Sequence, residues 1–214
     1  EGVNIFSVDF AKVEAALRET PQVQDVRLAR KLPDQIEVSI TARRPIAWVA
    51  APGETGDPSA SEKSLLVDAG GFLMRSRHIM PEYFHLPAIY GAKSDNVRDG
   101  EPLPGEDLRL AVRLIETVAR HPNSLLHIRA IDVSRGYCLE VVNDANARIL
   151  FGTTDFEEQL ARLQQLLAHC NETGRSLERV NLMVKRNTPV TFVAVADPLP
   201  ENPVASPAPA AQPT

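Results

Sequence analysis

The sequence has few of the residues on which metal and cofactor sites depend. Its 214 residues include only two cysteines and five histidines. His121 and His127 lie six positions apart, and His78 and His85 lie seven apart, which matches no zinc motif on a helix. No Cys-x-x-Cys pair is present to complete such a motif. We therefore predict a protein with no metal site and no bound cofactor.

Motifs of nucleotide-binding and hydrolytic enzymes are also absent. The sequence contains no Walker A loop, no dinucleotide-binding glycine fingerprint and no nucleophile elbow. Asp68 precedes Gly70 and Gly71 and is explained by a turn, and Asp132 is explained by the end of a strand. We predict no catalytic residue and no enzymatic activity, and a hydrolase with an unrecognised site is retained as an alternative.

The chain has neither an excess of positive charge nor a long apolar run. Lysine and arginine number 23 against 28 acidic residues, a net charge of -5, which argues against a nucleic-acid-binding protein. Basic clusters at 27–31 and 43–44 fit either a solvated strand edge or a contact with a membrane surface or an acidic partner. No apolar run is long enough to span a bilayer, and no signal peptide is visible.

The two cysteines, Cys138 and Cys170, say little about the compartment of the protein. Each fits a small apolar residue that packs independently. A disulfide would need their β-carbons about 4 Å apart, a distance that sequence does not give. Both alternatives stay open at this stage.

The first 48 residues contain the pattern of a small α/β module. Phe10, Val13 and Leu17 recur at helical spacing, which predicts a helix from Asp9 to Thr20, where Pro21 ends it. A side-chain oxygen of Asp9 or Ser7 is placed to cap the first turn. Alternating runs at 26–30 and 36–41 then predict two strands joined by a turn at 32–35. The apolar stripe of the helix is expected to cover the apolar face of these strands.

The rest of the chain alternates strand-like and helix-like segments. A loop rich in turn formers is expected at 51–63, and a capping box at Thr154–Glu157 is expected to begin the second long helix. From Asp197 onward the chain is rich in proline and alanine and is predicted to be disordered. The pattern predicts an α+β domain with a largely antiparallel sheet. The expected strands are 46–49, 65–67, 72–74, 126–133, 138–142, 147–151, 180–185 and 190–195, and the expected helices are 108–120 and 156–167.

A series of short motifs follows one another in a specific order and spacing between residues 3 and 195. They are Asn4-Ile5-Phe6 with Val8-Asp9, Pro21-x-Val23, Arg30-x-x-Pro33, Arg43-Arg44-Pro45-Ile46-Ala47-Trp48, Leu66-Val67-Asp68-x-x-Gly71-Phe72, Leu86-Pro87-Ala88-Ile89-Tyr90-Gly91, and Leu150-Phe151-Gly152-Thr153-Thr154-Asp155 with Leu160-Ala161-Arg162-Leu163. In this order the motifs resemble the extracytoplasmic region of the bacterial cell-division family FtsQ/DivIB.

The resemblance implies a fold and a place in the cell. A POTRA domain, with helices on a small mixed sheet, would occupy residues 1–48, with its boundary between 45 and 50. A β-rich domain with flanking helices would occupy 49–196, and the tail would be 197–214. The family's members are anchored in the cytoplasmic membrane by one transmembrane helix, which would precede this chain, and they act at the division septum on the extracytoplasmic side.

The resemblance also implies a partner and the residues that bind it. In this family the strands after the last helix dock the division proteins FtsB and FtsL by strand addition. The corresponding positions here are Thr191, Phe192, Val193, Ala194 and Val195, with Arg135 before the middle hairpin and Val184 near a partner-contacting aromatic of the family. The chain departs from the family at Asn181-Leu182-Met183, where Asp-x-Arg is common.

Each of these positions also has an ordinary structural explanation. The last strand can pair inside a sheet or be shielded by the tail, and Arg135 can be a turn residue before Gly136. By the same resemblance the POTRA half would dock other membrane division proteins. A different class of function stays as the alternative, a POTRA-containing component of outer-membrane assembly or secretion that acts as a chaperone.

Overall fold

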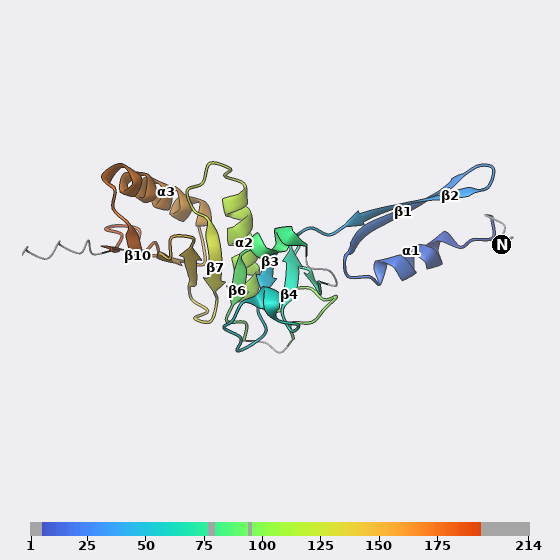
Figure 1. Ribbon diagram of the computed structural model, residues 1–214, viewed down its shortest axis with the longest axis horizontal. Helices are drawn as coiled ribbons and strands as arrows, with labels where there is room; N and C mark the ends of the chain where they lie inside the picture. Colours follow the sequence, from blue (N-terminus) through green and yellow to red (C-terminus); the bar gives the residue numbers. More distant parts are fainter. Residues whose placement is uncertain (1–5, 77–79, 94–95, 194–214) are drawn as a thin grey trace, which may run out of the picture.

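The computed structural model describes residues 6–76, 80–93 and 96–193. It contains a small N-terminal module of one helix and one hairpin, and a larger module built on a nine-stranded sheet. Figure 1 shows the two modules following one another along the long axis of the molecule. The predicted disordered tail at 197–214 lies outside the described residues.

The small module consists of α1 (Phe10–Arg18), β1 (Val23–Lys31) and β2 (Gln35–Ala42). Asp9 caps the helix as predicted, because its Oδ1 accepts hydrogen bonds from the backbone N–H groups of the second and third residues that follow it. The two strands pair antiparallel, which confirms the predicted hairpin. The described part of this module thus holds one helix and one antiparallel pair, fewer elements than the helices and mixed sheet that the resemblance implies.

The sheet of the larger module combines antiparallel and parallel pairs. Its spatial order is β11-β10-β9-β8-β7-β6-β3-β4-β5, and the pairs β9/β10, β3/β6 and β6/β7 are parallel while the others are antiparallel. The strands are β3 (Pro45–Val49), β4 (Leu65–Asp68), β5 (Leu73–Met74), β6 (Ala88–Tyr90), β7 (Ile128–Asp132), β8 (Leu139–Asn143), β9 (Arg148–Phe151), β10 (Leu177–Asn181) and β11 (Val190–Phe192). The α+β class predicted from the sequence is confirmed.

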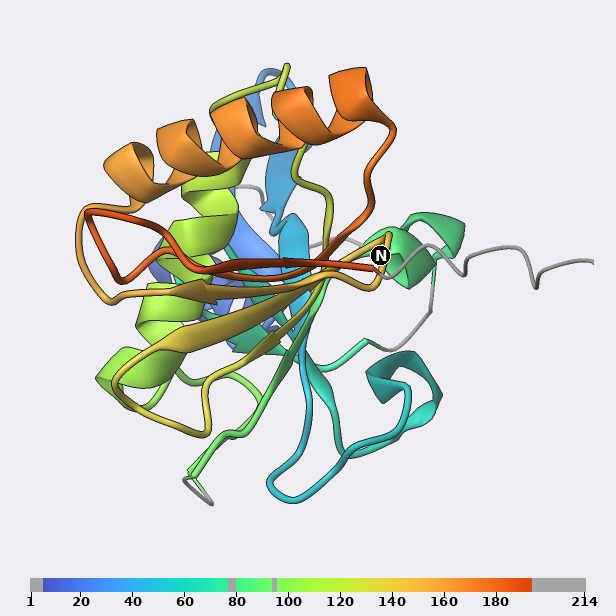
Figure 2. The ribbon, with the colours of Figure 1, turned by 90° about the vertical axis from the view of Figure 1, so that its left-hand side faces the viewer.

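Two helices, α2 (Glu106–Ala119) and α3 (Phe156–Thr173), cover one face of this sheet. Figure 2 shows both on the same side of the strands. The main core lies between them and the sheet, and its side chains alternate along each strand, as in Leu139 and Val141 of β8 or Ile149 and Phe151 of β9. We call this the helix-covered face of the sheet, and the opposite side its outer face.

Within the described part of the chain, an apolar cluster covers the outer face over β6, β3, β4 and β5. Trp48 of β3 is 3% exposed there and packs with Leu66, Met74 and Ala88. Its indole N–H donates to the carbonyl oxygen of Tyr83 at 2.8 Å. Tyr83 belongs to the short helix η2 (Pro81–His85), while η1 (Pro58–Ala60) lies within the predicted loop at 51–63.

The change from the small sheet to the large one falls between β2, which ends at Ala42, and β3, which begins at Pro45. The domain boundary expected between 45 and 50 stays a prediction. β3 pairs antiparallel with β4 across the loop at 51–63.

The structure corrects two local predictions. The strand predicted at 180–185 is β10, which ends at Asn181 because its Oδ1 accepts the backbone N–H of Met183 and turns the chain. The capping box at Thr154–Glu157 is wrong, since Asp155 adopts a left-handed conformation at the start of α3 and makes no side-chain cap. Gln159 ties this turn instead, accepting from Gly152 N and donating to the carbonyl of Thr154.

Candidate partner-binding site

The two edges of the nine-stranded sheet differ in how their backbone groups are satisfied. At the β5 edge, the segment at 100–103 runs alongside the strand. Leu73 N donates to Glu101 O at 2.9 Å, Gly100 N donates to Leu73 O at 3.0 Å, and Leu103 N donates to Gly71 O at 2.7 Å. This edge is therefore closed by the chain itself.

The β11 edge is open within the described part of the chain, where β11 pairs only with β10. Asn181 N donates to Pro189 O at 3.0 Å, and Val193 N donates to Ser176 O at 2.9 Å. Backbone groups in a strand alternate in direction, so Val190 and Phe192, between these positions, direct their N–H and C=O groups away from β10. These groups form a row to which another strand can add.

Side chains at this edge are divided between the two faces. Val190 and Phe192 pack against the main core on the helix-covered face. The guanidinium of Arg175 lies 5.4 Å from the centre of the Phe192 ring. Thr191 points to the outer face, and Val193, directly after the strand, is 52% exposed. Ala194 and Val195, the other two predicted site residues of this segment, lie outside the described residues.

Val184 lies in the connection between β10 and β11 and is partly exposed. Met183 beside it is also exposed, so the connection presents two neighbouring apolar side chains. The start of this connection lies against β9, because Leu182 N donates to Leu150 O, and β10 separates β9 from β11.

Arg135 lies in the turn between β7 and β8, and its Nη2 is 2.9 Å from Oε2 of the buried Glu140. A hydrogen bond with the Tyr137 side chain, and then the charge of Glu140, raise the pKa of Arg135 above its ordinary value. Two strands, β9 and β10, separate β8 from β11. The structure therefore does not bring Arg135 into contact with the open edge.

Two arginines that were not predicted from the sequence lie between Arg135 and the open β11 edge. Strand register aligns Val142 of β8 with Arg148 of β9, Arg148 with Arg179 of β10, and Arg179 with Thr191 of β11. This row lies on the outer face, and Arg148 Nη1 also binds Glu140, at 3.2 Å. Arg135, Arg148 and Arg179 together form what we call the outer-face arginine row. In the sequence Arg148 and Arg179 alternate with core residues, which indicates that their side chains face away from the core. Their alignment in one row depends on the register of four strands.

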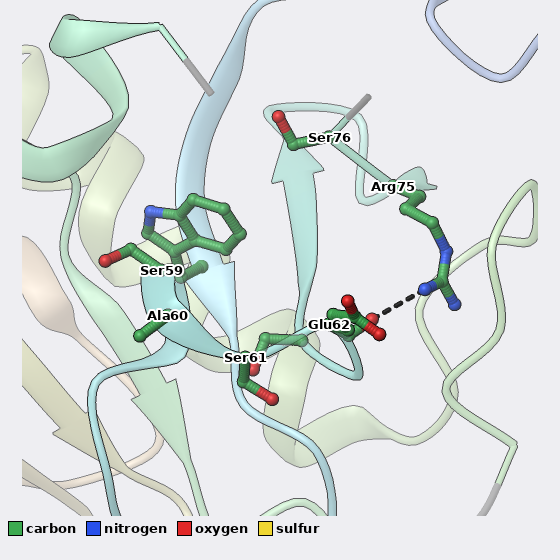
Figure 3. Close-up of a pocket in the computed structure, with 8 residues that line it drawn as sticks. Ser59, Ala60, Ser61, Glu62, Arg75 and Ser76 are labelled. Atoms are coloured by element: carbon green, nitrogen blue, oxygen red, sulfur yellow. Dashed lines mark hydrogen bonds between the residues drawn. The ribbon is translucent and has the colours of Figure 1, made fainter. Parts of the chain in front are cut away.

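A pocket beside Trp48 gathers no set of catalytic side chains from the described ranges of the chain. The pocket in Figure 3, of about 290 Å³, is lined by Ser59, Ser61, Ser64, Ser76 and other residues, and by no histidine or cysteine among those described. The Arg75 guanidinium turns to the carbonyl of Glu62, and Ser59 and Ser64 donate to carboxylates of their own loop. The retained hydrolase alternative gains no set of acid, base and nucleophile here.

Residues 6–76, 80–93 and 96–193 hold two free cysteines and no cluster of metal ligands. Cys138 and Cys170 are both buried and unpaired, and burial raises the pKa of the Cys138 thiol. No three His, Cys, Asp or Glu side chains gather as a metal site would require. None of the described helices combines the length and the apolar character that crossing a membrane requires.

Comparison with known proteins gives two family matches and two relatives. Residues 59–183 match the model of the C-terminal region of cell division protein FtsQ/DivIB, and residues 1–43 match the FtsQ-type POTRA domain. The chain is 28% identical to the cell division protein FtsQ of Anaeromyxobacter sp. (strain K) over 91% of its own length and 63% of that relative. It is 26% identical to cell division protein FtsQ of Koribacter versatilis (strain Ellin345) over 86% of its length and 50% of that relative.

The chain spans about half to two thirds of the length of these relatives. The family match at 59–183 covers more than half of the chain and includes both helices that cover the large sheet. The match at 1–43 ends just before β3, where the small sheet gives way to the large one. The chain therefore belongs to the FtsQ/DivIB family of cell-division proteins.

Proposed function

We propose that this chain is a non-enzymatic scaffold of bacterial cell division, which recruits FtsB- and FtsL-like partners by strand addition to β11. In this proposal it acts on the extracytoplasmic side of the cytoplasmic membrane at the division septum. A transmembrane helix beyond this chain would hold it there, and the POTRA module would dock other membrane proteins of the division machinery. Membership of the FtsQ/DivIB family supports a role in cell division, and the open β11 edge supports binding by strand addition.

The asymmetry of the two sheet edges is the observation that carries this proposal. An exposed strand edge invites pairing with other chains, and soluble proteins usually cover or interrupt it. The segment at 100–103 covers β5 in this way, while the described chain leaves the N–H and C=O groups of Val190 and Phe192 directed outward at β11. A binding strand would satisfy these groups and gain affinity from main-chain hydrogen bonds.

The side chains around the edge indicate the chemistry of the added strand. On the helix-covered face, Val190 and Phe192 are only partly buried, so apolar residues of the partner would extend the core over them. On the outer face, Arg179 lies opposite Thr191, with Arg148 behind it. Acidic residues of the partner would face these cations. The proposed partner is thus an extended segment with apolar residues on one face and acidic residues on the other.

Hydrogen exchange tests the proposal directly. The chain is measured alone and with a synthetic peptide from the extracytoplasmic segment of the FtsB-like protein of the same organism. New protection at Val190 and Phe192 is expected, since their free N–H groups would become bonded. Protection that appears only at the covered β5 edge, or no protection with a peptide competent to bind the longer native protein, would contradict strand addition at β11.

A further inference from the structure

One arginine of α3 holds the connection that leads into the open edge strand. Arg162 donates from Nη1 to the carbonyl oxygen of Val184 and from Nη2 to the carbonyl oxygen of Leu182, both at 2.8 Å. The two carbonyls are two residues apart, and the planar fork of the guanidinium spans them. The helix is thereby joined to the connection between β10 and β11 through charge-assisted hydrogen bonds.

Fixing the Arg162 side chain in this position costs free energy, which the two hydrogen bonds to the carbonyls offset. Its Nε is buried and has no hydrogen-bond partner. A buried donor left unsatisfied is unfavourable, and a long side chain loses rotamer freedom when it is fixed. Lysine would present no such fork, and an apolar side chain would leave the carbonyls of Leu182 and Val184 without these donors. The guanidinium of Arg162 therefore holds both carbonyls at once.

Neighbouring contacts fix the same connection at other points. Leu182 N donates to Leu150 O of β9 at 2.9 Å, which attaches the start of the connection to the sheet. Lys185 Nζ lies 3.7 Å from Asp155 and 3.8 Å from Glu158, both at the start of α3. The side chains of these three residues are more than half exposed, so these ion pairs are screened by solvent and contribute little. Arg162 is the stronger link between α3 and the connection.

The edge strand is held by its pairing with β10 and by the packing of Val190 and Phe192, and Arg162 fixes the connection that precedes it. β11 comprises only Val190–Phe192, and its pairing with β10 includes an irregularity between Leu177 and Arg179. We propose that Arg162 is a positioning residue, which keeps β11 in the arrangement that accepts an added strand. This inference rests on the proposed function of the edge, and it adds the residue that prepares the edge for binding. Arg162 itself touches no partner in this account.

Hydrogen exchange of the free chain tests the positioning role without any partner. Arg162→Met keeps much of the side-chain length but removes the donors. Amides at 182–192 are expected to exchange about tenfold faster than in the native chain, while Ile131 and Val141 in the core keep their protection. The exchange rates at 182–192 in Arg162→Lys are expected to lie between those of the native chain and of Arg162→Met, because lysine can reach one carbonyl. If Arg162→Met prevents folding, Arg162→Lys must show the localised loss.

Arg109→Met provides a matched control. Arg109 of α2 also donates to a loop carbonyl, that of Leu103 at 3.2 Å, but this loop covers the opposite edge of the sheet. Its substitution is expected to change exchange near 100–105 and to leave 182–192 unchanged. Equal exchange at 182–192 in the native chain and in Arg162→Met would overturn the proposal. Loss of protection throughout the core in Arg162→Lys would overturn it as well, because the role would then be general.

A binding measurement separates this proposal from the one on which it rests. With the synthetic peptide described above, Arg162→Met is expected to lower the association rate about tenfold, because fewer molecules hold the edge ready for binding. Faster exchange in Arg162→Met, combined with a native chain that binds no peptide, would overturn strand addition but retain the positioning of β11. Peptide binding by the native chain with unchanged exchange and rate in Arg162→Met would overturn the positioning role alone.

Discussion

The Nη1 atom of Arg43 lies 2.7 Å from Oδ2 of Asp68, and this ion pair joins the link between the two modules to the β4–β5 turn. The two side chains are only 20% and 9% exposed. The Arg43 guanidinium also lies 3.9 Å from the centre of the Phe72 ring, while Phe72 N donates to Asp68 Oδ1. The backbone N–H of Arg43 donates to Gln22 O in the small module. One residue thus binds both modules.

Loss of the Asp68 charge is expected to destabilise the larger module. Asp68→Asn keeps an oxygen for Phe72 N but leaves the largely buried Arg43 without its counter-ion. We expect a fall of about 2–3 kcal/mol in the free energy of unfolding, measured by urea denaturation. Glu106→Gln is the control, because its pair with Arg113 is 3.5 Å long and more than half exposed, and the expected change is below about 0.5 kcal/mol. Equal effects of the two substitutions would contradict this account.

Gly91 allows the ends of β6 and β7 to approach each other closely. Its φ is +83°, and a Cβ built there would lie 2.6 Å from Ser134 N and 2.7 Å from Asp132 Oδ1. Asp132 Oδ1 already accepts the Ser134 N–H at 2.7 Å, so neither atom can move without loss of that bond. Gly91→Ala is therefore expected to lower the free energy of unfolding by about 3 kcal/mol, combining backbone strain with a clash.

The substitution Gly53→Ala measures the cost of backbone strain without the cost of a steric clash. Gly53 has a similar φ of +78°, but nothing lies within 4 Å of a Cβ built there. Its substitution is expected to cost only the strain, about 1 kcal/mol, in the same denaturation experiment. If Gly91→Ala and Gly53→Ala cost the same, the close approach to Ser134 contributes nothing.

Features set by neighbouring residues were predicted well from the sequence. The Asp9 cap and the hairpin of β1 and β2 depend on local spacing, and both are present. The failed capping box had the right residue types, but Gln159 competed for the same turn from the helix itself. Local patterns cannot decide between such rival hydrogen bonds.

Features set by strand register were not predicted. The outer-face arginine row requires Arg148 and Arg179 to fall level with Thr191 across three strands, and the irregularity between Leu177 and Arg179 sets that alignment. A shift of one residue would move these side chains to the other face. The role of Arg162 was equally hidden, because its partners are main-chain carbonyls twenty and more residues away.

The loop at 51–63 is expected to lose stability in acid because of Glu54. A hydrogen bond from Ser61, and further ones from the Ser64 hydroxyl and Ala51 N, lower the pKa of Glu54 from its ordinary 4.5, against the opposing effect of burial. Since the folded pKa is the lower one, the stabilisation is complete above the unfolded pKa. It is lost as the pH falls through the folded pKa. The difference in unfolding free energy between native chain and Glu54→Gln is therefore expected to shrink as the pH falls below 4.5. A difference that stays constant from neutral pH to acid would contradict this role.

The affinity of the β11 edge for its partner peptide is expected to depend more on Phe192 than on Arg135. Phe192→Ala removes the aromatic side chain that an added strand would cover, and the dissociation constant is expected to rise about thirtyfold. Arg135→Ala is expected to raise it about fivefold, less than Phe192→Ala because Arg135 lies two strands away from β11. Both variants are expected to remain folded, because Phe192 is only partly buried and Glu140 keeps Arg148 as a partner.

Matched substitutions elsewhere on the larger module complete this test. Phe84→Ala removes an aromatic side chain that is 60% exposed in η2, far along the sheet from β11, and Arg113→Ala removes an exposed arginine of α2. Neither is expected to change the affinity, which isothermal titration calorimetry measures for all four variants. Unchanged affinity in both Phe192→Ala and Arg135→Ala would remove the proposed site. An effect confined to Phe192→Ala would restrict the site to the open edge and exclude the turn between β7 and β8.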